Sequence, residues 1–308
     1  MNKRHLTGIL AIGAAASLAL AGCATGNDVA GGSSSGGSDG GDASLGTITL
    51  GYLPSWTDGL STAYLLQDQL EKIGYTVKMQ ELTEAGPLYA GLAQGDVDIY
   101  PSAWPELTHK SYMDQYGDKI DDLGEYYGGA KLTIAVPEYV DIDSIEDLKD
   151  NADRFGGKIY GIEPGAGLTK QTQESMIPEY GLGDGYQLVT SSTAAMLTEL
   201  DSAEAAQRDI VVTSWRPFWA NDRYGLKDLE DPKGAMGDAE ALHFLGTDGF
   251  AEEYPEAAEY IAGIALDDEQ YASLEDMVVN EYGEGKEAEA VDAWLEANPD
   301  AYDTIVTD

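Results

Sequence analysis

Two stretches of the chain show the same pattern: DVDIYPSAW (residues 96–104) and RDIVVTSW (residues 208–215). Each reads as a short strand that ends at a tryptophan, although such a large ring more often lies inside a core. The segments before them also match, because Trp104 follows Gly51 by 53 residues and Trp215 follows Gly161 by 54. This internal repeat predicts two halves of similar structure.

Both halves show the order strand, helix, strand, helix, strand. We expect strands at 47–53, 75–82, 97–103, 158–164, 186–192 and 209–214, and helices at 61–74, 86–95, 169–181 and 194–206. Glycine after the last periodic residue of a helix, as at positions 74 and 181, is a common C-terminal signal. The alternation of strands and helices predicts a mainly parallel sheet flanked by helices in each half.

The remaining segments complete a two-lobed α/β fold. A strand at 128–140 links the halves, a strand at 239–250 returns, and the helical tail covers the first half. The predicted domains are lobe I, at 47–133 plus 246–308, and lobe II, at 134–245. Because ligands of such sheets bind beyond the carboxyl ends of the strands, we expect a cleft between the lobes.

The N-terminus has the features of a secretory signal peptide over residues 1–22, with a basic start and an apolar run. Its end, LAGC, resembles the bacterial lipobox and predicts lipidation of Cys23, the chain's single cysteine. The alternative is an ordinary cleaved signal with an accidental cysteine. Residues 23–46 are rich in Gly, Ser and Asp and read as a flexible tether. We therefore expect a monomer anchored at the outer face of the cytoplasmic membrane, at the cell surface or in the periplasm.

The formal net charge is −39. So acidic a chain argues against nucleic acid and anionic membrane surfaces as partners. Stretches such as DDLGEYY (121–127) read most simply as solvated acidic surface. The charge therefore excludes partners and does not identify a ligand.

Three tryptophans lie where the predicted strands of the two halves end: Trp56, Trp104 and Trp215. Tryptophan is the best cation–π partner, and aromatic cages commonly hold quaternary ammonium groups. Three rings offer roughly 4–6 kcal/mol before binding costs, whereas a micromolar complex needs about 8 kcal/mol. The site should therefore hold a second group.

The second group is predicted to be an anion. The segment EPGAGLTK (163–170) is a glycine-rich loop that opens a helix, where free N–H groups and the helix dipole favour a carboxylate. His109 could donate a further hydrogen bond. Taken alone, His109 would be structural and the loop an ordinary helix start. Together with the cage they describe a zwitterion site.

Several stretches carry a resemblance to a known family: GYLPSW, YAGLAQGDVDIYPSAWPELTHKSY, GIEPGAGL, VVTSWRPFWANDRYGLKDLEDPKG and EALHFLGTDGF. From about residue 48 to its end, the chain resembles the glycine betaine-binding lipoproteins that serve ABC importers of compatible solutes. The resemblance implies a type II, venus-flytrap fold and delivery of a small zwitterion to a membrane permease for osmoprotection. We expect no cofactor and no metal.

The resemblance also assigns roles to residues. The trimethylammonium group would lie among Trp56, Trp104 and Trp215, and the carboxylate would bind the N–H groups of Gly167 and Leu168 and the side chain of His109. The chain departs from the family pattern at Arg216, where Thr or Ser is usual. A guanidinium there would repel the ligand unless it points away or pairs with an acid.

Other ligands and functions stay open. Proline betaine, carnitine, ectoine and dimethylsulfonioacetate carry both charges, whereas choline lacks the carboxylate. A ligand-sensing lipoprotein without a transport role would use the same cleft. An enzyme is disfavoured, because no nucleophile, base and orienting acid occur at recognisable spacing and no metal-ligand pattern emerges.

Overall fold

The structure, a computed structural model, describes residues 44–306. The predicted signal peptide, Cys23 and the tether up to residue 43 lie outside the described residues. Within the described range, no helix combines the length and the apolar character needed to cross a membrane.

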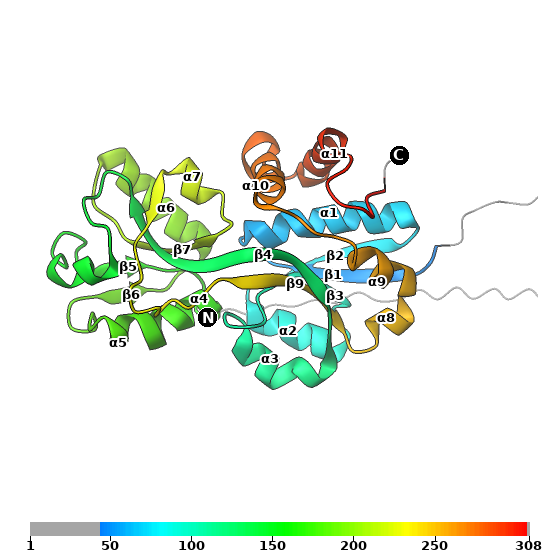
Figure 1. The fold of residues 1–308 in the computed structure, drawn as a ribbon, viewed down its shortest axis with the longest axis horizontal. Helices are drawn as coiled ribbons and strands as arrows, with labels where there is room; N and C mark the ends of the chain where they lie inside the picture. Colours follow the sequence, from blue (N-terminus) through cyan, green and yellow to red (C-terminus); the bar gives the residue numbers. More distant parts are fainter. Residues whose placement is uncertain (1–43, 307–308) are drawn as a thin grey trace, which may run out of the picture. The chain divides into compact units, whose positions relative to one another are not determined.

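The first repeat forms three parallel strands and two helices (Figure 1). Its elements are β1 (Thr47–Tyr52), α1 (Thr57–Ile73), β2 (Thr76–Glu81), α2 (Ala85–Gln94) and β3 (Ile99–Ala103). Strand β1 lies between β2 and β3 and pairs in parallel with both. Helix α1 ends at Gly74, whose φ of 117° is a left-handed conformation that favours glycine, as the sequence predicts.

The second repeat has the same topology. Its elements are β5 (Lys158–Tyr160), a helical run of α4 (Gly167–Gln171), a π-helical turn (Thr172–Met176) and α5 (Ile177–Glu179), then β6 (Gln187–Val189), α6 (Thr193–Ala206) and β7 (Val212–Arg216). Strand β5 lies between β6 and β7, parallel to both. The orders β2-β1-β3 and β6-β5-β7 are therefore equivalent, and the predicted α/β fold is confirmed.

Two antiparallel strands join the halves, β4 (Ile120–Pro137) and β9 (Glu240–Thr247) (Figure 1). Strand β4 pairs with β9 as far as Ala130 and with β7 from Lys131 onward. Strand β9 pairs with β3 and β4 alone, and β8 (Leu226–Asp228) pairs with β4. The change between sheets thus falls a few residues before the predicted lobe boundaries at 133/134 and 245/246. The division into lobes as domains stays a prediction.

The prediction of solvated surface for 121–127 is wrong in part, because β4 begins at Ile120 rather than at residue 128. Asp122 and Glu125 are exposed, but Tyr126 and Tyr127 are buried. Tyr126 stacks on Phe244 of β9, with ring centroids 4.4 Å apart. The acidic residues of this segment therefore gave no sign that its tyrosines belong to the core.

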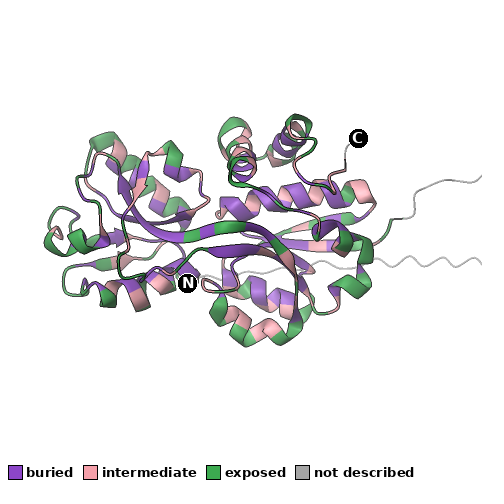
Figure 2. Cartoon of the chain, viewed as in Figure 1, coloured by how far each residue is buried: buried purple, intermediate pink, exposed green. Residues whose placement is uncertain are grey.

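The remaining helices pack around the sheets and around the helices already described. They have buried inner faces and exposed outer faces (Figure 2), except the helix at Lys110–Tyr116, which has no buried residue. They are α3 (Lys110–Tyr116), α7 (Ala220–Arg223), α8 (Phe250–Glu253), α9 (Pro255–Ile261), α10 (Asp268–Asp276) and α11 (Glu287–Ala297), with 3₁₀ turns at Gly117–Lys119 and Ile145–Asp150 and a π-helical turn at Met277–Tyr282. Helices α10 and α11 pack on α1. Trp294 of α11 is fully buried and donates its indole N–H to Ser273, 2.8 Å away, so this tryptophan belongs to the core of lobe I.

Candidate ligand-binding site

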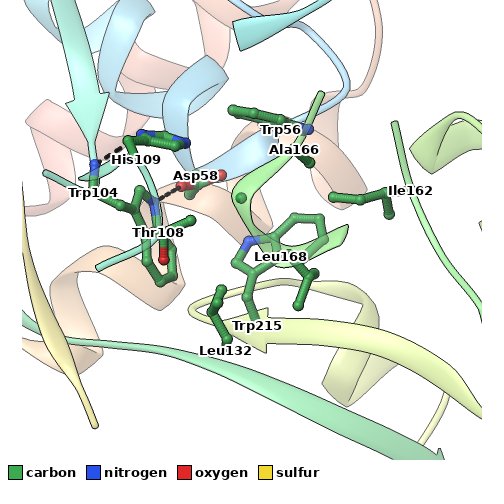
Figure 3. A pocket seen from close by; sticks show the side chains of 11 residues that line it. Trp56, Asp58, Trp104, Thr108, His109, Leu132, Ile162, Ala166, Leu168 and Trp215 are labelled. Atoms are coloured by element: carbon green, nitrogen blue, oxygen red, sulfur yellow. Dashed lines mark hydrogen bonds between the residues drawn. The ribbon is translucent and has the colours of Figure 1, made fainter. Parts of the chain in front are cut away.

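A cavity lies between the lobes at the carboxyl ends of the strands (Figure 3). Its empty space, including the opening to solvent, is about 330 Å³. Its lining residues are Trp56, Asp58, Trp104, Thr108, His109, Leu132, Ile162, Ala166, Gly167, Leu168 and Trp215. All six residues predicted to contact a ligand belong to this set.

Each predicted residue reaches the cavity from the end of a strand or from the segment that follows a strand. Trp104 directly follows β3, and Trp215 lies near the end of β7. Trp56 immediately precedes α1 in the loop after β1, and Gly167 is the first residue of α4 in the loop after β5. His109 lies just before α3. The parallel topology thus brings together residues that are up to 159 positions apart, from Trp56 to Trp215.

The three indole rings are held by other rings and by burial. Trp104 and Trp215 are buried, whereas Trp56 is half-buried. Trp56 stacks on the imidazole of His109, with centroids 5.8 Å apart and an interplanar angle of 15°. Trp215 stacks on Phe218 at 3.8 Å and 17°. These contacts restrict the rings that face the cavity, so little ordering is required when a ligand binds.

Two of the indoles donate their N–H groups to carboxylates. Trp104 Nε1 lies 3.3 Å from Asp58 Oδ2, and Trp56 Nε1 lies 3.2 Å from Glu163 Oε2. The ring faces, rather than these N–H groups, are then left for a ligand. These carboxylates also place negative charge at the edges of two rings, which strengthens the attraction of the site for a cation.

The sequence analysis missed Asp58, a buried carboxylate in the cavity wall. Burial raises the pKa of Asp58, opposed by hydrogen bonds from the Ser102 hydroxyl, a backbone N–H at Gly59 and the Trp104 indole. The available signal was an acid two residues after Trp56. An acid in the first turn of a helix is common without any ligand, so that signal was weak.

His109 is fixed as a neutral donor. The backbone N–H of Trp104 donates to His109 Nδ1 at 3.2 Å, and the Tyr89 hydroxyl lies 3.0 Å from the same atom. A nitrogen that accepts from a backbone N–H carries no proton, so the ring proton is assigned to Nε2. Burial lowers the pKa of His109 to about 3, so the ring is uncharged at neutral pH. Its Nε2–H can therefore donate to an anionic group.

The lobes touch at the glycine-rich loop. A Cβ atom added to Gly167 would lie 2.0 Å from the backbone oxygen of Thr108, so only glycine fits this approach. Nearby, the Tyr112 hydroxyl donates to the Gly165 carbonyl oxygen at 2.7 Å. Gly167 and Leu168 open a helix, where N–H groups have no carbonyl acceptor within the helix itself. Those N–H groups can donate hydrogen bonds to an anion.

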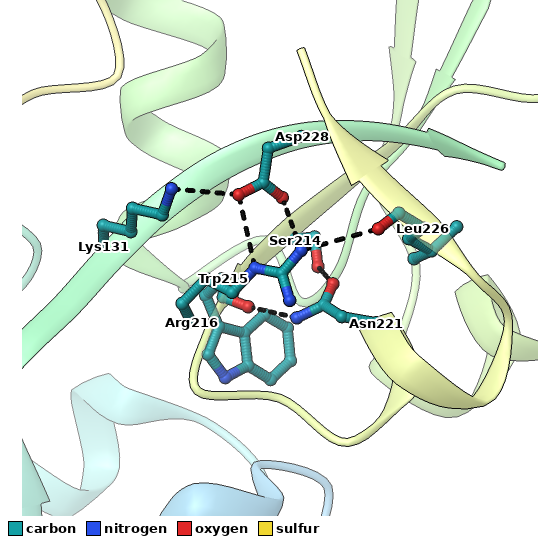
Figure 4. A network of polar contacts seen from close by, with 7 residues as sticks. All are labelled: Lys131, Ser214, Trp215, Arg216, Asn221, Leu226 and Asp228. Carbon is teal, nitrogen blue, oxygen red and sulfur yellow. Dashed lines mark hydrogen bonds and ion pairs between the residues drawn. The ribbon is translucent and has the colours of Figure 1, made fainter. Parts of the chain in front are cut away.

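Arg216 does not enter the cage (Figure 4). Its guanidinium forms two hydrogen bonds with Asp228, at 3.2 and 3.1 Å, and Lys131 Nζ lies 3.0 Å from the same carboxylate. Burial acts to raise the pKa of Asp228, but Arg216 and Lys131 outweigh it and hold the pKa below its ordinary value. The departure from the family pattern is thus neutralised by an acid outside the cavity.

One further histidine and one further tryptophan lie outside the cavity. His243 on β9 pairs with Asp122, with Nδ1 2.9 Å from Oδ1. Trp219 contacts Phe218 and Tyr224 through its ring. Across the described residues 44–306, no group of three or more His, Cys, Asp or Glu side chains is arranged to hold a metal ion.

A cavity at strand ends between two α/β lobes, walled by aromatic rings and one buried carboxylate, is typical of the class of two-lobed solute-binding proteins. Residues 46–297 match the family described as the substrate binding domain of the ABC-type glycine betaine transport system. The chain belongs to this family, and the resemblance inferred from its motifs is confirmed.

Individual relatives support this family assignment. The chain is 38% identical over 156 residues to the glycine betaine/carnitine transport binding protein GbuC of Listeria monocytogenes, a match covering 49% of this chain and 50% of that protein. The chain therefore spans about half the length of this curated relative. It is 25% identical over 285 residues to the glycine betaine/proline betaine-binding periplasmic protein of Escherichia coli K12, covering 79% and 84% of the two chains.

Solved structures show the same fold. The glycine betaine, L-proline-binding protein ProX of Borrelia burgdorferi is 32% identical, with a TM-score of 0.76 over 82% of this chain and 93% of that chain. Lactococcal OpuAC, in its closed-liganded conformation complexed with glycine betaine, is 31% identical, with a TM-score of 0.75 over 82% and 96%. These neighbours are binding proteins with the type II periplasmic-binding fold.

Proposed function

We propose that the protein captures glycine betaine, or a closely related quaternary-ammonium zwitterion, outside the cytoplasm and delivers it to an ABC importer. The observation that carries this proposal is the composition of one cavity. Three tryptophans, a neutral histidine donor and a helix-opening glycine loop line it together. The names of the relatives point to the same ligand class.

In this proposal the cationic and anionic ends of the ligand bind different groups of the cavity. The trimethylammonium group lies among the faces of Trp56, Trp104 and Trp215, with Asp58 supplying negative charge nearby. The carboxylate accepts hydrogen bonds from His109 Nε2–H and from the N–H groups of Gly167 and Leu168. Cation and anion then each have a partner in a site that excludes water, which strengthens both interactions.

Closure of the lobes completes the site. His109 and two of the tryptophans come from lobe I, whereas Trp215 and the glycine loop come from lobe II. A ligand that touches both sets favours the closed arrangement, because it gains contacts there that neither lobe offers alone. The closed form would be what the permease recognises.

The proposal also covers the location of the protein and its lack of a catalytic role. Lipidation of Cys23 would anchor a monomer at the outer face of the membrane, with residues 23–46 as a tether. The Cys23→Ser variant should then appear in the soluble fraction instead of the membrane fraction. We propose no catalytic role, since the relatives are substrate-binding proteins and the polar groups of the cavity suit recognition.

The test is calorimetric titration of residues 24–308 with glycine betaine and, in parallel, choline. Tight binding of glycine betaine with little heat from choline supports a zwitterion site. Preferential binding of choline would instead assign the cation to the cage and Asp58, and would leave the His109 and Gly167 groups without a ligand partner. Ectoine and proline betaine then rank the remaining zwitterions.

A further inference from the structure

Glu163 lies outside the cavity lining, yet it contacts both lobes. The residue is 5% exposed, in the loop that follows β5. Its Oε1 accepts from Ser55 Oγ at 3.2 Å and from the Thr193 N–H at 3.0 Å. Its Oε2 accepts from Trp56 Nε1 at 3.2 Å and from Thr193 Oγ1 at 2.9 Å. Each oxygen therefore has one donor from each lobe.

The lobe II half of this arrangement does not need lobe I. Thr193 is the first residue of α6, a helix of 14 residues, so the carboxylate lies at a helix N-terminus that favours negative charge. All four contacts reach the carboxyl group from donors, so none requires it to be protonated. Lobe II thus holds a ready acceptor at the position that Trp56 and Ser55 reach when the lobes meet.

The backbone of Glu163 also shapes the glycine-rich loop. Its carbonyl oxygen accepts from the Ala166 N–H at 3.1 Å and from Thr169 Oγ1 at 2.8 Å. These two bonds define the turn from which Gly167 and Leu168 reach the cavity. One residue is therefore connected to the loop proposed for the carboxylate and to a ring proposed for the cation.

We propose that Glu163 is a positioning residue that couples the orientation of the Trp56 ring to closure of the lobes. This inference rests on the proposed function, because it concerns the same cavity. With the lobes apart, Trp56 lacks this acceptor. With the lobes together, the Glu163 carboxylate orients the indole, makes its face more attractive to a cation, and holds Ser55. Its main effect is then on how long a ligand is retained.

The decisive measurement is the dissociation rate of the ligand, followed by stopped-flow tryptophan fluorescence in residues 24–308. Glu163→Gln should raise the rate roughly 10- to 100-fold, since it weakens hydrogen bonds to a charged acceptor. Ser55→Ala should raise it about 3- to 10-fold, although Ser55 does not line the cavity. Glu199→Gln on the outer side of α6 removes the same charge from lobe II and should leave the rate unchanged.

A purely structural role within lobe II gives a different pattern. Glu163→Gln would then lower the melting temperature of the ligand-free protein, and Ser55→Ala would not change dissociation. That result overturns the proposal. The coupling predicts instead that Ser55→Ala adds less in a Glu163→Gln background than alone, because both changes break the same contact.

Glycine betaine and choline are both used as probes. If choline binds and glycine betaine does not, the ligand assignment is refuted, and the role of Glu163 is tested with the dissociation rate of choline. Equal dissociation rates in the native protein, Glu163→Gln and Ser55→Ala, for whichever probe binds, refute the role of Glu163.

Discussion

Replacing His109 by alanine tests whether a neutral imidazole holds the ligand's anionic end. The variant removes the Nε2–H donor, and a hydrogen bond to a charged group contributes about 1.5–3 kcal/mol. We therefore expect the dissociation constant for glycine betaine to rise roughly 10- to 150-fold. His243→Asn is the matched control, because His243 pairs with Asp122 away from the cavity and should leave affinity unchanged.

The pH dependence sharpens this test. Because burial lowers the pKa of His109 to about 3, the ring stays neutral and its contribution to affinity is constant between about pH 5.5 and 7.5. Titrations of the native protein and His109→Ala across this range should therefore differ by a constant factor. The comparison cancels the effect of any other titratable group, because both proteins contain it.

The opposite pH dependence would contradict the role of a neutral His109. If the native protein bound about tenfold more tightly at pH 5.5 than at 7.5 and His109→Ala did not, the imidazolium would be the binding form. The Nε2–H tautomer assigned from the Trp104 N–H contact would then be wrong.

The same pKa shift has a consequence for stability. The unfolded chain takes up a proton on His109 below about pH 6.5, but the folded protein does not until about pH 3. The contribution of His109 is therefore complete above pH 6.5 and falls by about 1.4 kcal/mol per pH unit below it. Chemical denaturation should show a shallower acid loss of stability in His109→Ala than in the native protein.

Three further predictions concern the surroundings of the site. Burial raises the pKa of Glu275 to about 8, so its contribution to stability is present below about pH 4.5 and is lost as pH rises towards 8. Glu275→Gln should therefore have the same free energy of unfolding as the native protein near pH 4.5 and a larger one at pH 8. The difference should grow by at most about 1.4 kcal/mol for each pH unit between these values, as measured by urea denaturation. Gly167→Ala should weaken glycine betaine binding at least about 100-fold in calorimetry, since its Cβ atom meets the Thr108 oxygen and the lobes cannot close, with a far smaller change in the ligand-free melting temperature. Asp228→Asn should weaken binding about 3- to 10-fold at low salt, because Arg216 loses its partner near a cation site, and added salt should reduce the difference; an effect that ignores salt would contradict this electrostatic explanation.

The topology and the main candidates for the site can be predicted from the amino-acid sequence alone. Two strands that end at Trp104 and Trp215, within repeats of nearly equal length, require that both rings lie at the carboxyl ends of parallel strands. The glycine loop before α4 follows from the same rule. These features are local, or repeat along the chain, so a single sequence displays them.

Which groups contact these residues depends on how the chain folds in three dimensions. Trp56 is 107 positions from Glu163, and Asp58 is 44 positions from Ser102, and no local pattern announces either contact. The direction of Arg216 depends on Asp228 and Lys131, which come from two other strands. The protonation of His109 depends on a backbone N–H that only the fold places beside it. Side-chain charge and ring orientation are set by neighbours distant in sequence, and the tautomer of His109 by the path of the turn after Trp104. Both exist only once the chain has folded.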